Sequence, residues 1–524
     1  MDSSRFAATG RRWAVATPHT AATAAAAAAF EAGGNAVDAA VTANAVLAVA
    51  YPHMCGIGGD LFAVVADSRS RLAVNGSGAA ALALDADRMR LAHGAMPAQG
   101  PLSVSVPGTV AAWQELISRF GRRSLADAIG PAIGYAQDGV AVSRSVARAI
   151  VKHRDRINAD AGLRDLFVAA GRPLMENDVL KQPALAGSMR ALAEMGSAAL
   201  YTGALGARLI AGLRSLGSPL TADDFRRHTT EVVAPLARPY RRREVLVPPP
   251  NSQGFVLDEI LGCVERANLE PDHLGSNAPL MAHLFLLASA DRDRLLADPR
   301  RASVPVDELL ADDHARELIE QARAGVTPGA LGRAASGDTV GIVAADADGL
   351  WVSINQSLFD AFGSGILEPE TGIIAHNRGS SFSLDSRSPN RIEGGKRPAH
   401  TLMPVMVLDR GAPAIASATM GRNAHAQIHA ELLMALIDQG RQAFEAVDRP
   451  RWLAGGLRAE AAGIVAESRV PKSVIAGFVA SGMEVEHLDG WDEQVGHAQL
   501  IARGADGDLH AASDPRADGA AACG

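Results

Sequence analysis

The sequence predicts an α/β protein whose sheets are covered by helices, built as two domains or as one large layered domain. Its 524 residues exceed what one ordinary hydrophobic core organises. Helical spacing of apolar residues dominates before residue 325, and the shorter period of strands appears after residue 339. Strand-rich stretches flanked by helix-rich ones are typical of sheets packed against helices.

The N-terminal part contains two predicted helices and a hairpin. An alanine-rich helix at about 21–32 ends at a glycine pair, and a second one follows at 36–50. A glycine-dense turn at 55–60 leads into strands at 61–66 and 72–75.

Helices are predicted for most of the middle of the chain. The region 110–235 has helical spacing, and a short strand at 244–247 is stopped by three prolines. Helices resume from about 254 to 324. The glycine-rich segment 325–338 is predicted to be an exposed loop, and it is a suitable place for a chain cut.

The C-terminal part begins with a predicted hairpin, because an Asp-Gly turn at 346–349 joins two apolar runs. A helix at about 424–439 and a last strand near 498–502 are also expected. The other predicted strands lie at 339–345, 350–356, 404–408 and 414–418.

Composition favours a small-molecule partner over nucleic acid or a membrane. The net charge of −8 provides no basic stripe, and no run of about 18 strongly apolar residues is present. The three cysteines form neither a disulfide framework nor a zinc spacing, which fits a reducing cytoplasm. The alanine run at 24–29 is interrupted upstream by Pro18, so we interpret it as a structural helix and not as a secretory signal.

The usual catalytic and nucleotide-binding signatures are missing from the sequence. Neither G-x-S-x-G, H-E-x-x-H nor a P-loop occurs, and Gly56–Gly59 precedes a strand, as a tight turn does. Gly337-Asp338-Thr339 is a weak signal alone, because a threonine at a strand start is usually only structural. Its sequence context makes it specific.

The chain resembles the γ-glutamyltransferase family of N-terminal-nucleophile hydrolases from Ala14 to Asp518. The matches follow one another in order along the chain, which makes coincidence untenable. They are Gly33–Ala40, Gly56–Asp60, Val106–Val110, the triple proline with Asn251-Ser252, Ala290–Arg292, Asp338-Thr339, Phe362–Ile366, Lys396–Pro398, Met420-Gly421 and Ala512–Arg516.

The resemblance implies a four-layer αββα fold and a self-cleaving precursor. The Thr339 hydroxyl would attack the carbonyl of Asp338, and water would then release a large subunit 1–338 and a small subunit 339–524. The two subunits would form a heterodimer, with further assembly left open. An α-amine titrates near pH ~8, so the new amine of Thr339 could serve as the base for its own hydroxyl. No metal or organic cofactor is required.

Three further catalytic positions carry over from the family. Ser357 falls where the family has a threonine that supports the new α-amine. Gly421 and Arg422 fall where two glycines offer backbone N–H groups to the oxyanion, each typically contributing ~3 kcal/mol. Arg422 retains its N–H, but its side chain is new at this position.

The family's groups for the two charges of a γ-glutamyl substrate are replaced here. Losing one charge-assisted contact typically costs ~1.5–3 kcal/mol, so ordinary γ-glutamyl binding should be lost. Ser77 stands where the family has an arginine that binds the α-carboxylate. Phe359, Arg378 and Ser381 stand where the family has the groups that hold the ammonium. His400 and Thr401 replace a serine pair that normally assists the carboxylate.

A pocket containing Arg378, His400 and Arg422 suits a small anionic amide. The run Asn377–Asp385 resembles the oxamate-amidohydrolase side of the family, and this resemblance makes oxamate the named candidate. A true γ-glutamyl transferase or glutathione hydrolase remains the alternative if Arg387 or Arg397 takes over binding. A catalytically inactive binding protein with the same fold is the alternative from another class. Sequence does not decide between hydrolysis and transfer to an amine.

His425 and His429 lie four residues apart on a predicted helix and could share one face. Without the intervening glutamate of H-E-x-x-H this spacing is weak evidence for a metal. Substrate contact and an ordinary helix-surface or packing role are the other two interpretations.

Overall fold

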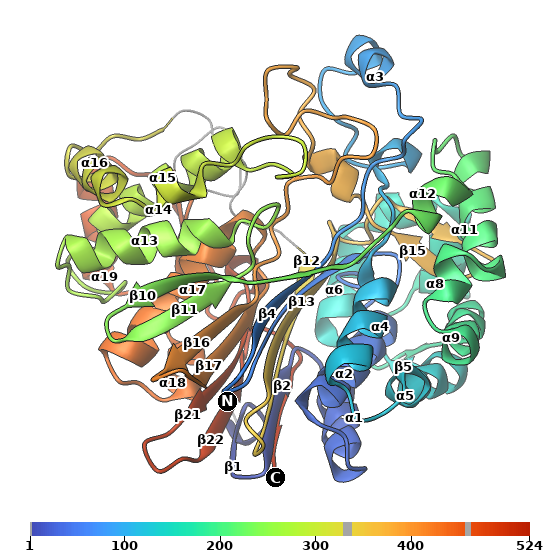
Figure 1. Ribbon diagram of the computed structural model, residues 1–524, viewed down its shortest axis with the longest axis horizontal. Helices are drawn as coiled ribbons and strands as arrows, with labels where there is room; N and C mark the ends of the chain where they lie inside the picture. Colours follow the sequence, from blue (N-terminus) through green and yellow to red (C-terminus); the bar gives the residue numbers. More distant parts are fainter. Residues whose placement is uncertain (1–2, 329–337, 456–462) are drawn as a thin grey trace.

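The computed structural model describes residues 3–328, 338–455 and 463–524, and it contains two seven-stranded sheets packed face to face (Figure 1). Every strand pairing within these two sheets is antiparallel. Most of the predicted loop 325–338 lies outside the described residues.

The first sheet carries the Asp338-Thr339 segment at its centre. Its strands, in spatial order, are β23 (Ala520–Cys523), β2 (Trp13–Thr17), β12 (Asp338–Asp346), β13 (Trp351–Phe359), β3 (Asp60–Ala66), β4 (Arg71–Gly76) and β9 (Glu231–Val233).

The second sheet packs against the first through small and aliphatic side chains such as Ala16, Val343, Met406 and Ala418. Its strands, in spatial order, are β1 (Ala7–Gly10), β22 (Leu509–Ser513), β21 (Ala498–Arg503), β17 (Ala412–Thr419), β16 (Val405–Asp409), β11 (Arg243–Val247) and β10 (Leu236–Tyr240).

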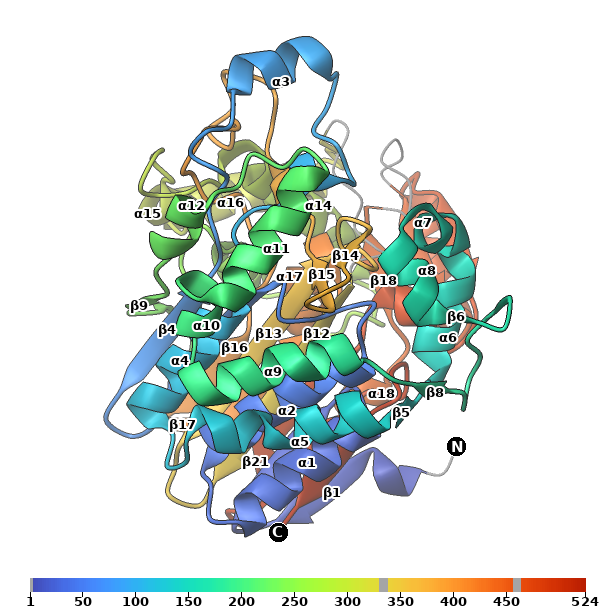
Figure 2. The ribbon, with the colours of Figure 1, turned by 90° about the vertical axis from the view of Figure 1, so that its right-hand side faces the viewer.

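Helices cover the outer face of each sheet, so the layers run helix, sheet, sheet, helix (Figures 1 and 2). The first sheet is covered by α1 (Thr20–Glu31), α2 (Ala36–Ala50), α4 (Thr109–Phe120), α5 (Leu125–Asp138) and α9 (Pro183–Met195). The second is covered by α13 (Gly254–Arg266), α14 (Ala278–Leu295), α16 (Asp312–Arg323), α17 (His425–Leu433) and α18 (Ala443–Asp448).

This arrangement confirms the predicted αββα fold. Helix α2 is buried along its whole length between the first sheet and its neighbouring helices, and Asn35 caps its N-terminus in a box with Asp38. None of the helices in the described ranges combines the length and apolarity that crossing a bilayer needs.

Three details of the predicted elements are wrong. The region 110–235 is not helical to its end, because Glu231–Val233 forms β9 and pairs with β4. The predicted helix at 424–439 changes to a π-helical turn at Met434. The strand at 498–503 is not the last, since β22 and β23 follow it.

Candidate active site

Thr339 lies at the start of the central strand β12, and its side chain is only 2% exposed. The pairing register with β13 shifts between Asp338 and Thr339, which places Thr339 opposite Ser357. Such irregularities turn a side chain away from the regular alternation of a strand. The Thr339 hydroxyl consequently donates a hydrogen bond to Ser357 Oγ over 3.2 Å.

The Ser357 hydroxyl connects Thr339 to the carbonyl that precedes it. Ser357 Oγ donates to the carbonyl oxygen of Asp338 over 2.6 Å and accepts from the backbone N–H of Phe359 over 2.8 Å. A hydroxyl has one proton and two lone pairs, so these three bonds fill its capacity. The Thr339 hydroxyl and the Asp338 carbonyl are therefore held by one side chain.

The Asp338 side chain faces a cavity of about 570 Å³ whose lining includes Asp360, Arg422 and Glu493. Burial, together with the carboxylates of Asp360 and Glu493, raises the pKa of the Asp338 carboxyl to about 8. This carboxyl is therefore largely protonated at neutral pH.

Gly421 and Arg422 form the turn that follows β17. Arg422 has a left-handed φ of 50°, a conformation that favours the glycine found there in the family. Its carbonyl oxygen accepts from Gln253 Nε2 over 3.0 Å, and Arg292 Nη1 donates to the carbonyl of Asn423 over 2.8 Å. Helices α13 and α14 thus fix the turn that would supply the oxyanion donors.

The new side chain of Arg422 folds over Phe359. Its Nη2 donates to Asp360 over 2.6 Å, and its guanidinium carbon lies 4.5 Å from the centre of the Phe359 ring. The guanidinium carbon of Arg378 lies 3.9 Å from the same ring centre. Phe359 therefore contacts two cations, an arrangement that stabilises both charges.

Arg378 is buried, with 1% of its surface exposed, and one of its donors is unused. Nη1 donates to Thr401 Oγ1 over 3.2 Å, whereas Nη2 has no hydrogen-bond partner among the described residues. Burial lowers the pKa of the Arg378 guanidinium to about 9, and the Asp60 carboxylate opposes this. The group remains charged at neutral pH, with a donor available to an added acceptor.

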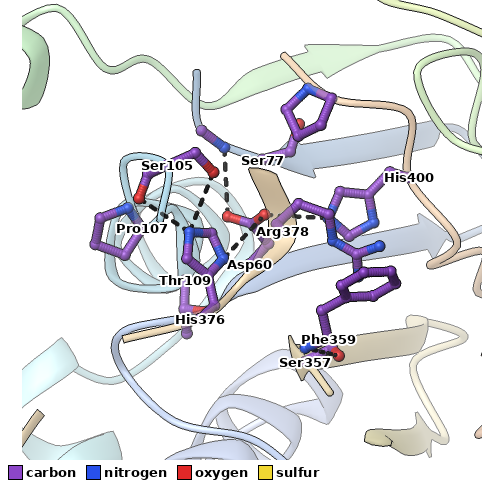
Figure 3. Close-up of polar contacts among 12 residues, drawn as sticks. Asp60, Ser77, Ser105, Pro107, Thr109, Ser357, Phe359, His376, Arg378 and His400 are labelled. Carbon is purple, nitrogen blue, oxygen red and sulfur yellow. Dashed lines mark hydrogen bonds and ion pairs between the residues drawn. The ribbon is translucent and has the colours of Figure 1, made fainter. Parts of the chain in front are cut away.

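Asp60 is the centre of a buried network behind this arginine (Figure 3). The Leu402 N–H donates to His400 Nδ1, so the proton of His400 lies on Nε2, which donates to Asp60 over 3.1 Å. His376 Nδ1 lies 3.5 Å from the same carboxylate. Burial opposes ionisation of Asp60, but His376 and His400 outweigh it and lower the pKa of this carboxyl.

His400 consequently contributes no positive charge. Burial and the neighbouring Arg378 lower the pKa of His400 to about 3, so the ring is neutral. The positive charge near the predicted arginine- and histidine-rich pocket therefore comes from Arg378 and Arg422 and not from His400.

A second cavity of about 720 Å³ adjoins the first around Met96, Phe359 and Arg422. Four of the predicted site residues line it, namely Ser381, His400, Thr401 and Arg422.

Two predicted substrate-binding residues, Ser77 and Arg378, line neither cavity. Ser77 is fully buried and bonded to Asn75 over 2.7 Å, outside the lining of both cavities. Arg378 lies behind Phe359 and Thr401. The alternative arginines are engaged elsewhere, Arg387 with Asp385 at the surface and Arg397 with Glu231 over 2.8 Å.

His425 and His429 are both buried beneath the second sheet. His429 Nδ1 lies 2.9 Å from Ser417 Oγ, and its Nε2 lies 3.3 Å from Thr419 Oγ1. These contacts give His429 a packing role, which is one of the three interpretations of its spacing from His425.

Sequence reasoning missed Asp60, His376 and Asp360 as site residues. Asp60 ends one of the matched family motifs, and a charged residue directly after a glycine-rich turn and before a buried strand was a usable signal. His376 and Asp360 had no local signal, because only the fold brings them to Asp60 and Arg422.

Comparisons with known proteins agree with this geometry. The sequence model of the Gamma-glutamyltranspeptidase family matches residues 22–524. The glutathione hydrolase-like YwrD proenzyme of Bacillus subtilis is 35% identical, with 98% of each chain covered. The oxamate amidohydrolase proenzyme of Klebsiella pneumoniae is also 35% identical, over 96% of this chain and 97% of the relative. Cephalosporin acylase from Bacillus halodurans has a TM-score of 0.91 at 30% identity, covering 100% of this chain and 98% of that one.

Proposed function

Because the chain belongs to the γ-glutamyltranspeptidase family of hydrolases and transferases acting on amides, we propose that it is a self-processing amidohydrolase with Thr339 as its nucleophile. The observation that carries this proposal is the hydrogen-bond chain from Thr339 through Ser357 to the carbonyl of Asp338.

Self-cleavage begins at the Asp338–Thr339 peptide. Thr339 Oγ attacks the Asp338 carbonyl carbon, and Ser357 stabilises the negative charge that develops on the carbonyl oxygen. The C–N bond then breaks, the nitrogen takes up the proton, and an ester joins Asp338 to Thr339 Oγ. Water hydrolyses this ester and leaves a new carboxylate on Asp338 and a free α-amine on Thr339.

The two products, 1–338 and 339–524, would remain associated because each sheet contains strands from both of them. In the first sheet, β12 of the small subunit pairs with β2 of the large one, and β13 pairs with β3. In the second sheet, β16 pairs with β11 and β22 pairs with β1.

Turnover then uses the same threonine. The α-amine of Thr339 takes the hydroxyl proton, Oγ attacks the substrate amide carbon, and the amine leaving group departs with a proton. The backbone N–H groups of Gly421 and Arg422 bind the oxyanion, and water hydrolyses the acyl-threonine ester. Acceptance of the acyl group by an amine in place of water would make the enzyme a transferase.

The charges around the cavities favour a small anionic amide as substrate. Arg422 lies in the wall of both cavities, and the buried Arg378 adds a second positive charge behind Phe359 and Thr401. Three carboxylates in the cavity walls are already paired with arginines, and burial raises the pKa of the two others, Asp338 and Glu493, which weakens their attraction for an ammonium group. These pairs are Asp293 with Arg292, Asp385 with Arg387, and Asp360 with Arg422.

Oxamate carries a carboxylate beside an amide and is the substrate named for one relative. Purified protein should release ammonia from oxamate and show little turnover of γ-glutamyl-p-nitroanilide, with Thr339→Ala as the blank. Robust turnover of γ-glutamyl-p-nitroanilide alone would support the glutathione hydrolase alternative. An intact wild-type chain of 54.3 kDa that hydrolyses neither would support a non-catalytic protein.

A further inference from the structure

Three helices on the outer face of the second sheet bring Glu259, Asp291 and His314 together. Glu259 lies on α13, Asp291 on α14 and His314 on α16, which pack side by side in Figure 1. One ligand-type atom from each lies within 4.8 Å of the other two. We refer to these three residues as the Glu259 cluster.

The Glu259 carboxylate is the most weakly partnered member of the cluster. It is 3% exposed, neither oxygen has a hydrogen-bond partner among the described residues, and its ion pair with His314 Nε2 is long, at 3.5 Å. The preceding Asp258 is also buried with two unpartnered oxygens. A buried carboxylate without a donor is strongly disfavoured unless it acquires a cation or a proton.

Neither arginine near the cluster hydrogen-bonds Glu259 in the described part of the chain. Arg294 donates to Asp291 Oδ1 over 2.6 Å, which leaves Oδ2 facing His314. Arg238 Nη1 donates to the carbonyl of Leu310, and its buried Nε makes no hydrogen bond to a described residue. His314 has one ring nitrogen, Nε2, to share between two acids, so a single proton there cannot bond both well.

The separations fit ligands around one metal ion. His314 Nε2 lies 2.9 Å from Asp291 Oδ2 and 3.5 Å from Glu259 Oε1. Metal–ligand bonds of about 2.0–2.2 Å at octahedral or tetrahedral angles place neighbouring ligand atoms about 2.9–3.5 Å apart. Both separations from His314 Nε2 fall in this range, and all three ligand atoms lie within 4.8 Å of one another.

We propose that Glu259, Asp291 and His314 form a site for a divalent first-row transition metal, with Zn²⁺ the best fit. An imidazole with two carboxylates is a donor set that Zn²⁺ accepts, and the His314 side chain is 19% exposed, which leaves a side open for water as a further ligand. The metal would cross-link α13, α14 and α16. Two of these helices hold the turn at Arg422. Gln253 directly precedes α13 and donates to the carbonyl of Arg422, and Arg292 on α14 donates to the carbonyl of Asn423.

The test uses the full-length protein after chelation and dialysis, titrated with Zn²⁺ alone by isothermal calorimetry, with bound metal counted by mass spectrometry. We expect about one Zn²⁺ per chain and a higher melting temperature with Zn²⁺ than without it. Glu259→Gln and His314→Ala should each weaken binding by at least about tenfold. His487→Ala is the matched control, because His487 is exposed and distant in sequence from the cluster.

Circular dichroism of Glu259→Gln, a substitution of nearly equal size, checks that the fold is retained. Wild-type protein that binds less than stoichiometric Zn²⁺ would overturn the proposal and show that Glu259 is held by a proton. Stoichiometric binding that survives both cluster substitutions would also overturn it, because the ion would then occupy another site.

Discussion

Replacing Ser357 with alanine removes one hydroxyl and the three hydrogen bonds that it makes. The bond that matters for self-cleavage is the donation to the Asp338 carbonyl oxygen at 2.6 Å. Loss of one donor to a developing oxyanion typically costs about 2.7–4 kcal/mol, or about 10²–10³ in rate. Ser357→Ala should therefore process itself about 10²–10³-fold more slowly than the wild type.

The assay follows the disappearance of the full-length band on denaturing gels after synthesis or refolding. Ser357→Thr is the matched control, because it keeps the hydroxyl and supplies the residue typical of the family. It should process within about tenfold of the wild-type rate, since the donor is retained. Wild-type processing by Ser357→Ala would refute the role of this hydroxyl, and so would equal loss in both variants.

Three further predictions concern the nucleophile, the anion-binding arginine and acid stability. Thr339→Ala should give one uncut chain of 54.3 kDa on a denaturing gel, and two fragments from it would contradict self-processing at this bond. Arg422→Met should raise KM for oxamate about 10- to 100-fold by removing a charged donor from the cavity wall, while Arg387→Met should leave KM unchanged; the reverse pattern would assign the substrate anion to Arg387. Burial lowers the pKa of His400 and of His429 to about 3, so these rings are neutral when folded and their stabilising contribution is present above pH ~6.5. Melting temperature should fall as pH decreases from ~6.5 towards 3, because the unfolded chain binds protons that the folded chain excludes. A flat profile over that interval would contradict neutral buried histidines.

Much of the fold could be predicted where the signal is local. The alanine-rich helices α1 and α2 are separated at Gly33-Gly34 as expected, and the Asp348-Gly349 turn joins β12 to β13 as predicted. Alanine propensity and turn chemistry act within a few residues, so a single sequence reveals them.

The strands at the chain ends escaped prediction because their pairing is not local. β23 consists of three alanines and a cysteine, residues with little preference for strands, and it forms by pairing with β2, about 500 residues away in sequence. β1 likewise pairs only with β22. Tertiary contacts decide whether such segments become strands.

The residues of the site likewise divide into those that the sequence reveals and those that only the fold brings together. The family resemblance located Thr339, Ser357 and the turn at Gly421. The structure places Ser357 in contact with Thr339 and Asp338, and it places Arg422 in the wall of the cavity that Asp338 also lines. The sequence could not reveal that Asp60 binds His400 while Arg378 stacks on Phe359, because these contacts join segments more than 300 residues apart or depend on side-chain direction. The neutral state of His400 follows from that burial and not from its residue type.

The most direct test of the account is the N-terminal sequence and intact mass of the subunits in purified active protein. We predict two polypeptides that co-elute under native conditions and separate in denaturant, the smaller beginning Thr-Val-Gly-Ile-Val at residue 339. Active protein in which no chain begins at Thr339 would contradict the claim that a freed α-amine on this residue drives the reaction.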